Sequence, residues 1–130
     1  AQKYTERLKA EGRSQKDNKW IEISPSTFIL LPSTSLDRTS AYAQYSIRVK
    51  GEDKRQKVQI KLKEAGIPTA VHYPMPLHLQ ECFSYLGYKK GDFPVAERVS
   101  QEIMSLPMNP DLSDEEIEYI VKEVINATDN

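Results

Sequence analysis

Apolar and polar positions alternate with helical spacing near the carboxyl end of the chain. Ser113 and Glu116 have the spacing of a capping box, in which each side chain bonds the backbone N–H of the other residue. The residues that follow place an apolar stripe on one helix face: Ile117, Ile120, Val121, Val124 and Ile125. The pattern predicts a helix that starts after Ser113 and buries this stripe.

Period-two alternation predicts the clearest strand, over residues 41–49. One face of this strand would carry Ala41, Ala43, Tyr45, Ile47 and Val49, and the other Tyr42, Gln44, Ser46 and Arg48. The second set is either a plain polar surface or one side of a cleft. Shorter apolar runs at 20–23 and 28–31 also predict strands, and residues 32–40 a connection.

Two further helices are predicted in the first half of the chain. Ala1, Tyr4 and Leu8 have helical spacing before Gly12, and we expect this short helix to dock on the rest of the protein. Residues 52–65 fit both a strand and a helix. The acidic start, the Lys, Gln and Glu content, and the stop signals Gly66 and Pro68 favour a helix.

The stretch between residue 66 and the helix that starts after Ser113 is predicted to contain mixed elements. Residues 67–73 indicate a strand, and residues 79–86 a short helix that carries Leu79, Cys82, Phe83 and Leu86. A helix from about Pro94 would place Val95, Val99 and Ile103 on one face, followed by an extended piece at 104–108. Strands separated by amphipathic helices predict an α/β layer, in which the sheet need not be parallel.

Composition narrows the class of protein. The chain has 130 residues, of which 38% are hydrophobic and 28% charged, and this length suits one domain. A net charge of −1 gives no general attraction to nucleic acid or to an anionic membrane, and no apolar run reaches the roughly 20 residues of a membrane span. The single Cys82 excludes an internal disulfide and fits a cytoplasmic location.

Both histidines lie in residues 71–80, a proline-stiffened segment that is the strongest candidate for chemistry. His72, His78 and Cys82 would supply three zinc ligands, but the further ligands of a usual zinc site do not accompany them, so we assign no metal. Cys82 is either a buried, inert thiol or a nucleophile beside a histidine. Each histidine is equally consistent with a side chain packed in its loop. The isolated glycines exclude a phosphate-binding loop.

Several ordered motifs resemble one family. They are Ala43-Gln44-Tyr45-Ser46-Ile47-Arg48, then Leu62-Lys63-Glu64-Ala65-Gly66-Ile67-Pro68-Thr69 leading into residues 72–80, then Phe93-Pro94-Val95-Ala96-Glu97, Ser105-Leu106-Pro107-Met108 and Leu112-Ser113-Asp114-Glu115-Glu116. Together they are similar to the carboxy-terminal part of the DegT/DnrJ/EryC1/StrS sugar aminotransferases. The resemblance implies the α+β small domain of a fold-type I aminotransferase, residues 1–130, with a small, largely antiparallel sheet covered by helices. Residues 1–13 would form a helix linking it to an absent amino-terminal domain.

The resemblance also implies an activity. Family members transfer an amino group from an amino acid, usually glutamate, to a nucleotide-linked keto sugar, using pyridoxal 5'-phosphate (PLP) as the electron sink. The aminated sugar would be a precursor in the biosynthesis of a surface polysaccharide or of an antibiotic sugar. The implied partners are the PLP domain of the same protein, the nucleotide sugar and a second subunit. The implied substrate contacts are His72 and Tyr73, with His78 and Gln80 in second rank. Arg48 lies in a matching motif and is a further candidate contact.

The Schiff-base lysine is expected in the absent domain, so the chain alone should be inactive. Two alternatives to an aminotransferase stay open, a sugar dehydratase of the same family and a stand-alone binding module. Family dehydratases carry a different residue at that lysine position, which lies outside this chain. The chain begins like a helix already under way, as a fragment would, and a fragment should expose the apolar surface that met its missing partner. A stand-alone, non-catalytic binding module should instead be well folded without a partner.

Overall fold

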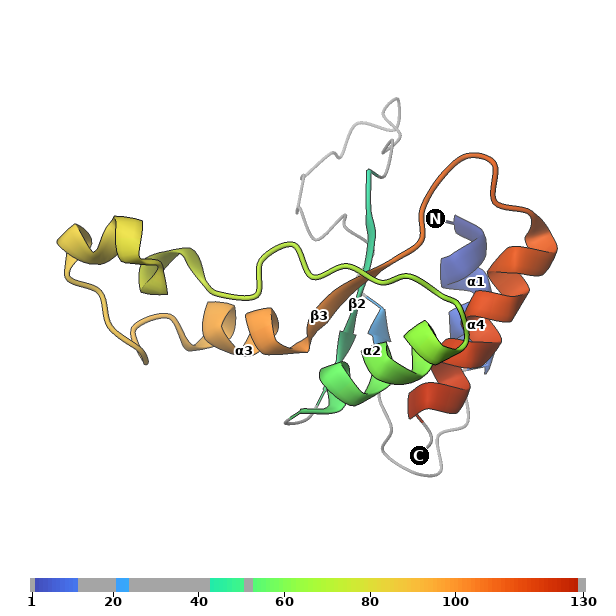
Figure 1. Cartoon of the computed structure of the whole chain (residues 1–130), viewed down its shortest axis with the longest axis horizontal. Coiled ribbons are helices and arrows are strands. Elements are labelled where there is room, and N and C mark those ends of the chain that lie inside the picture. The colour runs from blue at the N-terminus through green and yellow to red at the C-terminus, as the bar shows by residue number, and fades with distance from the viewer. Residues whose placement is uncertain (1, 12–20, 24–42, 51–52, 129–130) are drawn as a thin grey trace.

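The computed structural model describes residues 2–11, 21–23, 43–50 and 53–128, and it divides into a body and a projecting arm (Figure 1). The elements in chain order are α1 (Gln2–Glu11), β1 (Ile21–Ile23), β2 (Tyr45–Val49), α2 (Lys54–Glu64), the 3₁₀ helices η2 (Leu77–Leu79) and η3 (Glu81–Leu86), α3 (Pro94–Glu102), β3 (Ile103–Leu106) and α4 (Asp114–Thr128). We call residues 74–99 the arm. It extends to one side of the body, which holds the sheet and helices α1, α2 and α4.

The sheet of the body has three strands in the order β1-β2-β3, and both pairs are antiparallel. Strand β2 alternates as its sequence predicts, with Tyr45, Ile47 and Val49 buried and the residues between them partly exposed. It is shorter than predicted, because Ala43 and Gln44 precede the ladder and are exposed. The predicted small antiparallel sheet is therefore confirmed.

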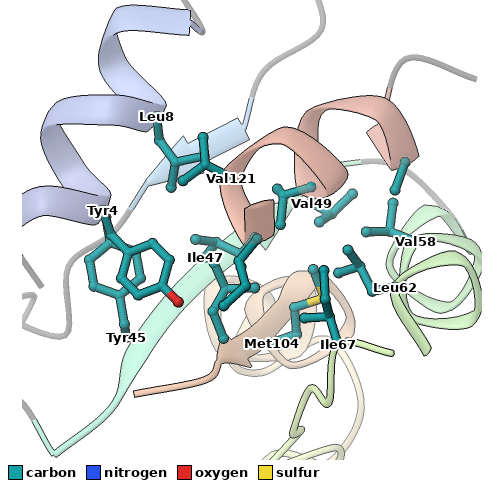
Figure 2. Close-up of a cluster of buried hydrophobic side chains, with 14 of the residues drawn as sticks. Tyr4, Leu8, Tyr45, Ile47, Val49, Val58, Leu62, Ile67, Met104 and Val121 are labelled. Atoms are coloured by element: carbon teal, nitrogen blue, oxygen red, sulfur yellow. The ribbon is translucent and has the colours of Figure 1, made fainter. Parts of the chain in front are cut away.

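Helices α1, α2 and α4 cover the apolar face of the sheet and close one hydrophobic core (Figure 2). The fully buried side chains Tyr45, Ile47 and Met104 come from the sheet, and Leu62 and Val121 from the helices. Each buried Leu, Ile or Val side chain contributes about 1.5–3 kcal/mol relative to exposure. No helix in the described part of the chain is long and apolar enough to cross a membrane.

Helix α1 docks through Tyr4 and Leu8, which confirms its predicted apolar face. The ring of Tyr4 stacks on Tyr45 with centroids 5.0 Å apart, and its hydroxyl donates to the carbonyl oxygen of Pro107 at 3.0 Å. Burial raises the pKa of Tyr4 to about 12, and the nearby Tyr45 and Glu116 add to the effect. The hydroxyl therefore keeps its proton and remains a donor at neutral pH.

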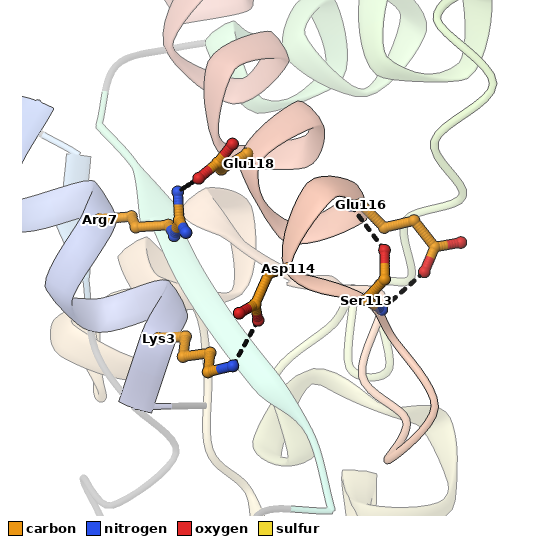
Figure 3. Close-up of polar contacts among 6 residues, drawn as sticks. All are labelled: Lys3, Arg7, Ser113, Asp114, Glu116 and Glu118. Carbon is orange, nitrogen blue, oxygen red and sulfur yellow. Dashed lines mark hydrogen bonds and ion pairs between the residues drawn. The ribbon is translucent and has the colours of Figure 1, made fainter.

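Helix α4 starts with the predicted capping box (Figure 3). The backbone N–H of Glu116 donates to Ser113 Oγ at 3.1 Å, and the N–H of Ser113 donates to Glu116 Oε2 at 2.8 Å. The predicted stripe is buried, with Ala127 added to it and Ile125 only partly covered. Ion pairs of Asp114 with Lys3 and of Glu118 with Arg7 tie the exposed side of α4 to α1.

The ambiguous segment 52–65 forms the helix α2, as the stop signals favoured. Its N-cap, Asp53, has a left-handed backbone with φ 58° and makes no side-chain cap. At the other end Gly66 takes φ 76°, which suits a residue without Cβ, and the Ile67 N–H bonds the Leu62 carbonyl at 2.8 Å. Ile67 then enters the core.

The strand predicted at 67–73 is wrong. Only Ala70 pairs, in an isolated bridge with Ser105, where N–H to O distances are 3.1 and 2.7 Å. Pro68 and Pro74 lack the N–H that a ladder needs, so the segment runs beside β3 without forming a strand.

Two predictions inside the arm also need correction. The helix predicted at 79–86 is two 3₁₀ pieces separated by the extended Gln80, and Cys82 is exposed rather than buried. Helix α3 does not bury the predicted stripe: Val95 is exposed, and Ile103 already belongs to β3. Too few neighbouring residues pack against the arm to bury such side chains. The predictions for residues 28–31 and 32–40 lie outside the described residues.

Candidate functional site

A shallow depression lies where the segment after Ala70 meets the outer face of the sheet, away from the core. It is lined by Gln44, Ser46, Ala70, Val71, His72, Tyr73, Ile103, Met104 and Ser105. Its volume is about 50 Å³, which is room for a few water-sized groups at an open surface. The predicted polar face of β2 thus forms one side of a cleft at Gln44 and Ser46.

Two serine hydroxyls pair across the strands in this depression. Ser46 and Ser105 are register partners in β2 and β3, and their Oγ atoms lie 2.9 Å apart. One hydroxyl donates to the other, which leaves one O–H and unused oxygen lone pairs to meet a further polar group. The lining residues include no Lys, Arg, Asp or Glu, and the polar side chains among them are those of Gln44, Ser46, His72, Tyr73 and Ser105.

His72 and Tyr73 stand at the rim of the depression. Their backbone leaves the sheet directly after the Ala70–Ser105 bridge, and Pro74 follows. Both side chains are exposed, Tyr73 to 69%. An imidazole that donates or accepts and an amphipathic aromatic ring are therefore presented together to anything that covers this face.

His78 and Gln80 lie in the arm and not at the depression. His78 Nε2 lies 3.1 Å from Glu97 Oε1, its ring packs 4.8 Å from that of Phe93, and its side chain is only 8% exposed. The Gln80 amide donates to the Met75 carbonyl at 3.4 Å. The structure thus divides the predicted contact residues into two groups, one at the sheet and one inside the arm.

Glu97 is the residue around which the arm is organised. Its Oε1 accepts from the N–H of Gly91 at 2.7 Å and of Phe93 at 3.4 Å, besides facing His78. The Gly91 hydrogen bond is the main reason that the pKa of Glu97 lies below its ordinary value, and His78 and Phe93 lower it further. The carboxylate is therefore anionic at neutral pH and joins both sides of the arm.

Arg48 holds the root of the arm to the sheet. Its Nε and Nη2 donate to Glu102 Oε2 at 3.1 and 2.6 Å, and both side chains are largely buried. Arg55 adds a second link, since it donates to the carbonyl of Ser100 at 3.0 Å. Sequence patterns assign no role to Glu97, Glu102 or Ser105, although Glu97 and Ser105 each lie within a motif that resembles the family.

No group of three or more His, Cys, Asp or Glu side chains in the described part of the chain is arranged to hold a metal ion. His72, His78 and Cys82 do not come together as ligands. Cys82 is exposed, and its thiol lies 3.8 Å from Gln80 Oε1.

A comparison with protein families identifies the family of this chain. The DegT/DnrJ/EryC1/StrS aminotransferase family matches residues 21–125. The chain belongs to this family. The resemblance seen in the sequence motifs is confirmed, as is the fold class.

Individual relatives agree with this assignment. The chain is 41% identical over 104 residues to the pleiotropic regulatory protein of Geobacillus stearothermophilus, covering 80% of this chain and 27% of that protein. It is 40% identical over 95 residues to the UDP-2-acetamido-2-deoxy-3-oxo-D-glucuronate aminotransferase of Pseudomonas aeruginosa, covering 73% of this chain and 25% of the enzyme. Among solved structures, Spr1654 of Streptococcus pneumoniae in its PMP form superposes with a TM-score of 0.70 at 25% identity, over 98% of this chain and 30% of that one. The chain thus spans about a quarter of the length of the curated relatives it matches.

Proposed function

We propose that this chain is the carboxy-terminal small domain of a PLP-dependent transaminase that moves an amino group from glutamate to the keto carbon of a nucleotide-linked sugar. The observation that carries the proposal is the placement of His72 and Tyr73 at the rim of a depression lined by the hydroxyls of Ser46 and Ser105. The Pseudomonas aeruginosa relative, named as an aminotransferase of an oxidised UDP-sugar, supports the substrate class.

The described residues do not fit the cofactor by themselves. No lysine lines the depression to form a Schiff base, and no Lys or Arg there could bind a phosphate. The proposal therefore assigns PLP to another part of a longer protein, for which the PMP form of the pneumococcal structure gives support. The chain alone would be inactive, and its contribution is to bind and orient the sugar.

His72 and Tyr73 are the proposed direct contacts. The depression can receive one small substituent of the sugar, and its free hydroxyl capacity matches a hydroxyl or carbonyl group on that substituent. His72 would hydrogen-bond an adjacent sugar hydroxyl while the Tyr73 ring covers the sugar face. Substrate contact by His78 and Gln80 stays a prediction, and both are already bonded within the arm.

We place the complete enzyme in the cytoplasm, acting as a homodimer. Nucleotide-linked sugars are its proposed substrates, and the amino-terminal PLP domain is the proposed partner of the outer sheet face. Closing a second domain over Tyr73 would exclude water from this side of the sugar.

The test is His72→Ala in the longer protein that carries this chain, with a nucleotide-linked keto sugar as acceptor and glutamate as donor. We expect kcat/KM for the sugar to fall roughly tenfold to a hundredfold, as for the loss of one or two hydrogen bonds to the substrate. The rate of the half-reaction with glutamate should stay unchanged, because that step needs no sugar.

Gln101→Ala is the matched control, since Gln101 is exposed on α3 and does not line the depression. Equal losses for His72→Ala and Gln101→Ala, or a loss confined to the glutamate half-reaction, would contradict the proposal. A product formed by loss of water rather than by amination would assign the protein to the dehydratase branch.

A further inference from the structure

The side chains of His72 and Tyr73 depend on the preceding residues for their position. After α2 the chain turns back and crosses the sheet towards the arm (Figure 1). Within the part of the chain that the structure describes, neither side chain has a hydrogen-bond partner of its own. Their placement at the depression is therefore set by the contacts that hold the chain just before them.

The chain after α2 places successive side chains on alternate sides. Ile67 is buried and Thr69 is partly buried on the side of the body. Ala70 and His72 are exposed, and both line the depression. In extended backbone a shift of one residue moves every side chain to the opposite face. A contact that keeps Thr69 against the body therefore also keeps His72 at the depression.

A hydrogen bond from α2 holds Thr69 in this orientation. The side-chain amide of Gln59 donates to Thr69 Oγ1 at 3.1 Å, and we call this bond the tether. Both residues are partly buried, where a hydrogen bond competes less with water than at an exposed site. Gln59 follows the buried Val58 on a helix that packs into the core, so the tether starts from a rigid element.

One backbone contact lies between the tether and His72. Ala70 and Ser105 exchange two backbone hydrogen bonds, at 3.1 and 2.7 Å, in an isolated bridge. A single bridge fixes the register of a segment less firmly than a ladder of several pairs does. The tether adds a second fixed point one residue earlier, and the two points together set the direction in which the chain continues to His72.

We propose that Gln59 and Thr69 are positioning residues for sugar recognition, because the tether sets the face on which His72 and Tyr73 meet the substrate. The role of His72 and Tyr73 as sugar contacts is taken from the proposed function, on which this inference rests. Neither Gln59 nor Thr69 lines the depression. Both therefore act through the backbone of the segment and not by touching the sugar.

Thr69→Val in the longer protein that carries this chain tests the proposal. Valine keeps the branched shape of threonine and removes the oxygen that accepts from Gln59. We expect KM for the nucleotide-linked keto sugar to rise about threefold to tenfold, as for the loss of one neutral hydrogen bond. The kcat should stay within about twofold, because the lost binding is common to the ground state and the transition state. Thr69→Ser keeps the oxygen and should restore the KM of the parent protein.

Two combinations of variants separate positioning from a general loss of structure. Gln59→Ala removes the donor of the same bond, so its combination with Thr69→Val should raise KM no further than either change alone. Thr69→Val should also leave KM unchanged in protein that already carries His72→Ala and Tyr73→Ala, because the contacts that it positions are gone. A general structural loss would add in full in both combinations.

Hydrogen exchange at the backbone N–H of Ala70 measures the tether without any substrate. Thr69→Val should accelerate this exchange about threefold to tenfold, since the segment loses one of its two fixed points. Thr69→Ser should keep the parent rate. Gln56→Ala is the matched control, because Gln56 is the same residue type, exposed on the same helix. It should leave both the exchange and the sugar KM unchanged.

The results distinguish failure of this inference from failure of the proposed function. A loss for His72→Ala without a loss for Thr69→Val would leave the sugar contact in place and overturn the inference. Unchanged exchange at Ala70, equal effects of Thr69→Val and Gln56→Ala, or full additivity in either combination would also overturn it. Normal kinetics of His72→Ala would contradict both proposals. Gln59→Ala carries the same expectations if Thr69→Val does not fold.

Discussion

The body and the arm are ordered by different forces. In the body, three helices close over one face of a sheet, and every fully buried large side chain among the described residues belongs to a single core. In the arm, a carboxylate joins the two sides through Gly91, Phe93 and His78 while apolar side chains face outward. Burial of apolar side chains therefore stabilises the body. Hydrogen bonds to Glu97 shape the arm, and its apolar side chains stay exposed. Substitutions that remove one force at a time can separate these contributions.

The largest expected effect is on the core of the body. Leu62→Ala removes a fully buried side chain of α2 and should lower the free energy of unfolding by about 2–5 kcal/mol. Ile60→Ala, two residues earlier on the same helix but half exposed, should change it by about 0.5 kcal/mol. Urea denaturation of both variants measures the difference, and similar losses would show that α2 does not pack as described.

A smaller and local effect is expected from Glu97→Ala. The backbone N–H groups of Gly91 and Phe93 lose their acceptor, so their hydrogen exchange should accelerate by roughly an order of magnitude. The urea midpoint should stay unchanged, because no core residue among those described lies in the arm. Gln101→Ala on the same helix is the control. A lower midpoint for Glu97→Ala alone would show that arm and body unfold together.

The smallest effect is a shift in the pH at which the arm loosens. Hydrogen bonding lowers the pKa of Glu97 below the ordinary 4.5, so its contribution is complete above that pH and is lost as the pH falls through the depressed value. The amide proton shift of Gly91 should titrate with a midpoint below 4.5, and Glu97→Ala should abolish this titration. A midpoint at or above 4.5 would refute the hydrogen-bond arrangement.

The body could be predicted from the sequence because local patterns and tertiary packing agree there. The alternation around Ile47 and the stripe beginning at Ile117 each match the buried face that the structure shows. The short β3 was also anticipated as an extended piece. In such segments the spacing of apolar residues along the chain matches the face that tertiary packing buries.

The elements of the arm could not be predicted from the sequence, because the spacing of its apolar side chains suggests a buried face and the side chains are exposed. Leu86 and Val95 have the spacing of an amphipathic helix, yet they face solvent in this chain. The role of Glu97 depends on Gly91, six residues away, which adopts φ 102° and turns its N–H to the carboxylate. A hydrogen bond that depends on the backbone conformation of a single residue leaves no periodic pattern in the sequence. At the depression, sequence motifs indicated His72 and Tyr73, but the cross-strand partner of Ser46 followed only from the register.

The two ends of the arm leave it with few degrees of freedom. Helix α3 ends at Glu102 and β3 begins at Ile103, so one end continues into the sheet without a loop. The other end is tied by the single bridge at Ala70, after which the chain passes through bends to the first 3₁₀ turn. The arm is therefore joined to the body at two places, the α3–β3 junction and the segment that follows Ala70. His72 and Tyr73 lie in that segment, so one of the two connections between arm and body runs along the rim of the depression.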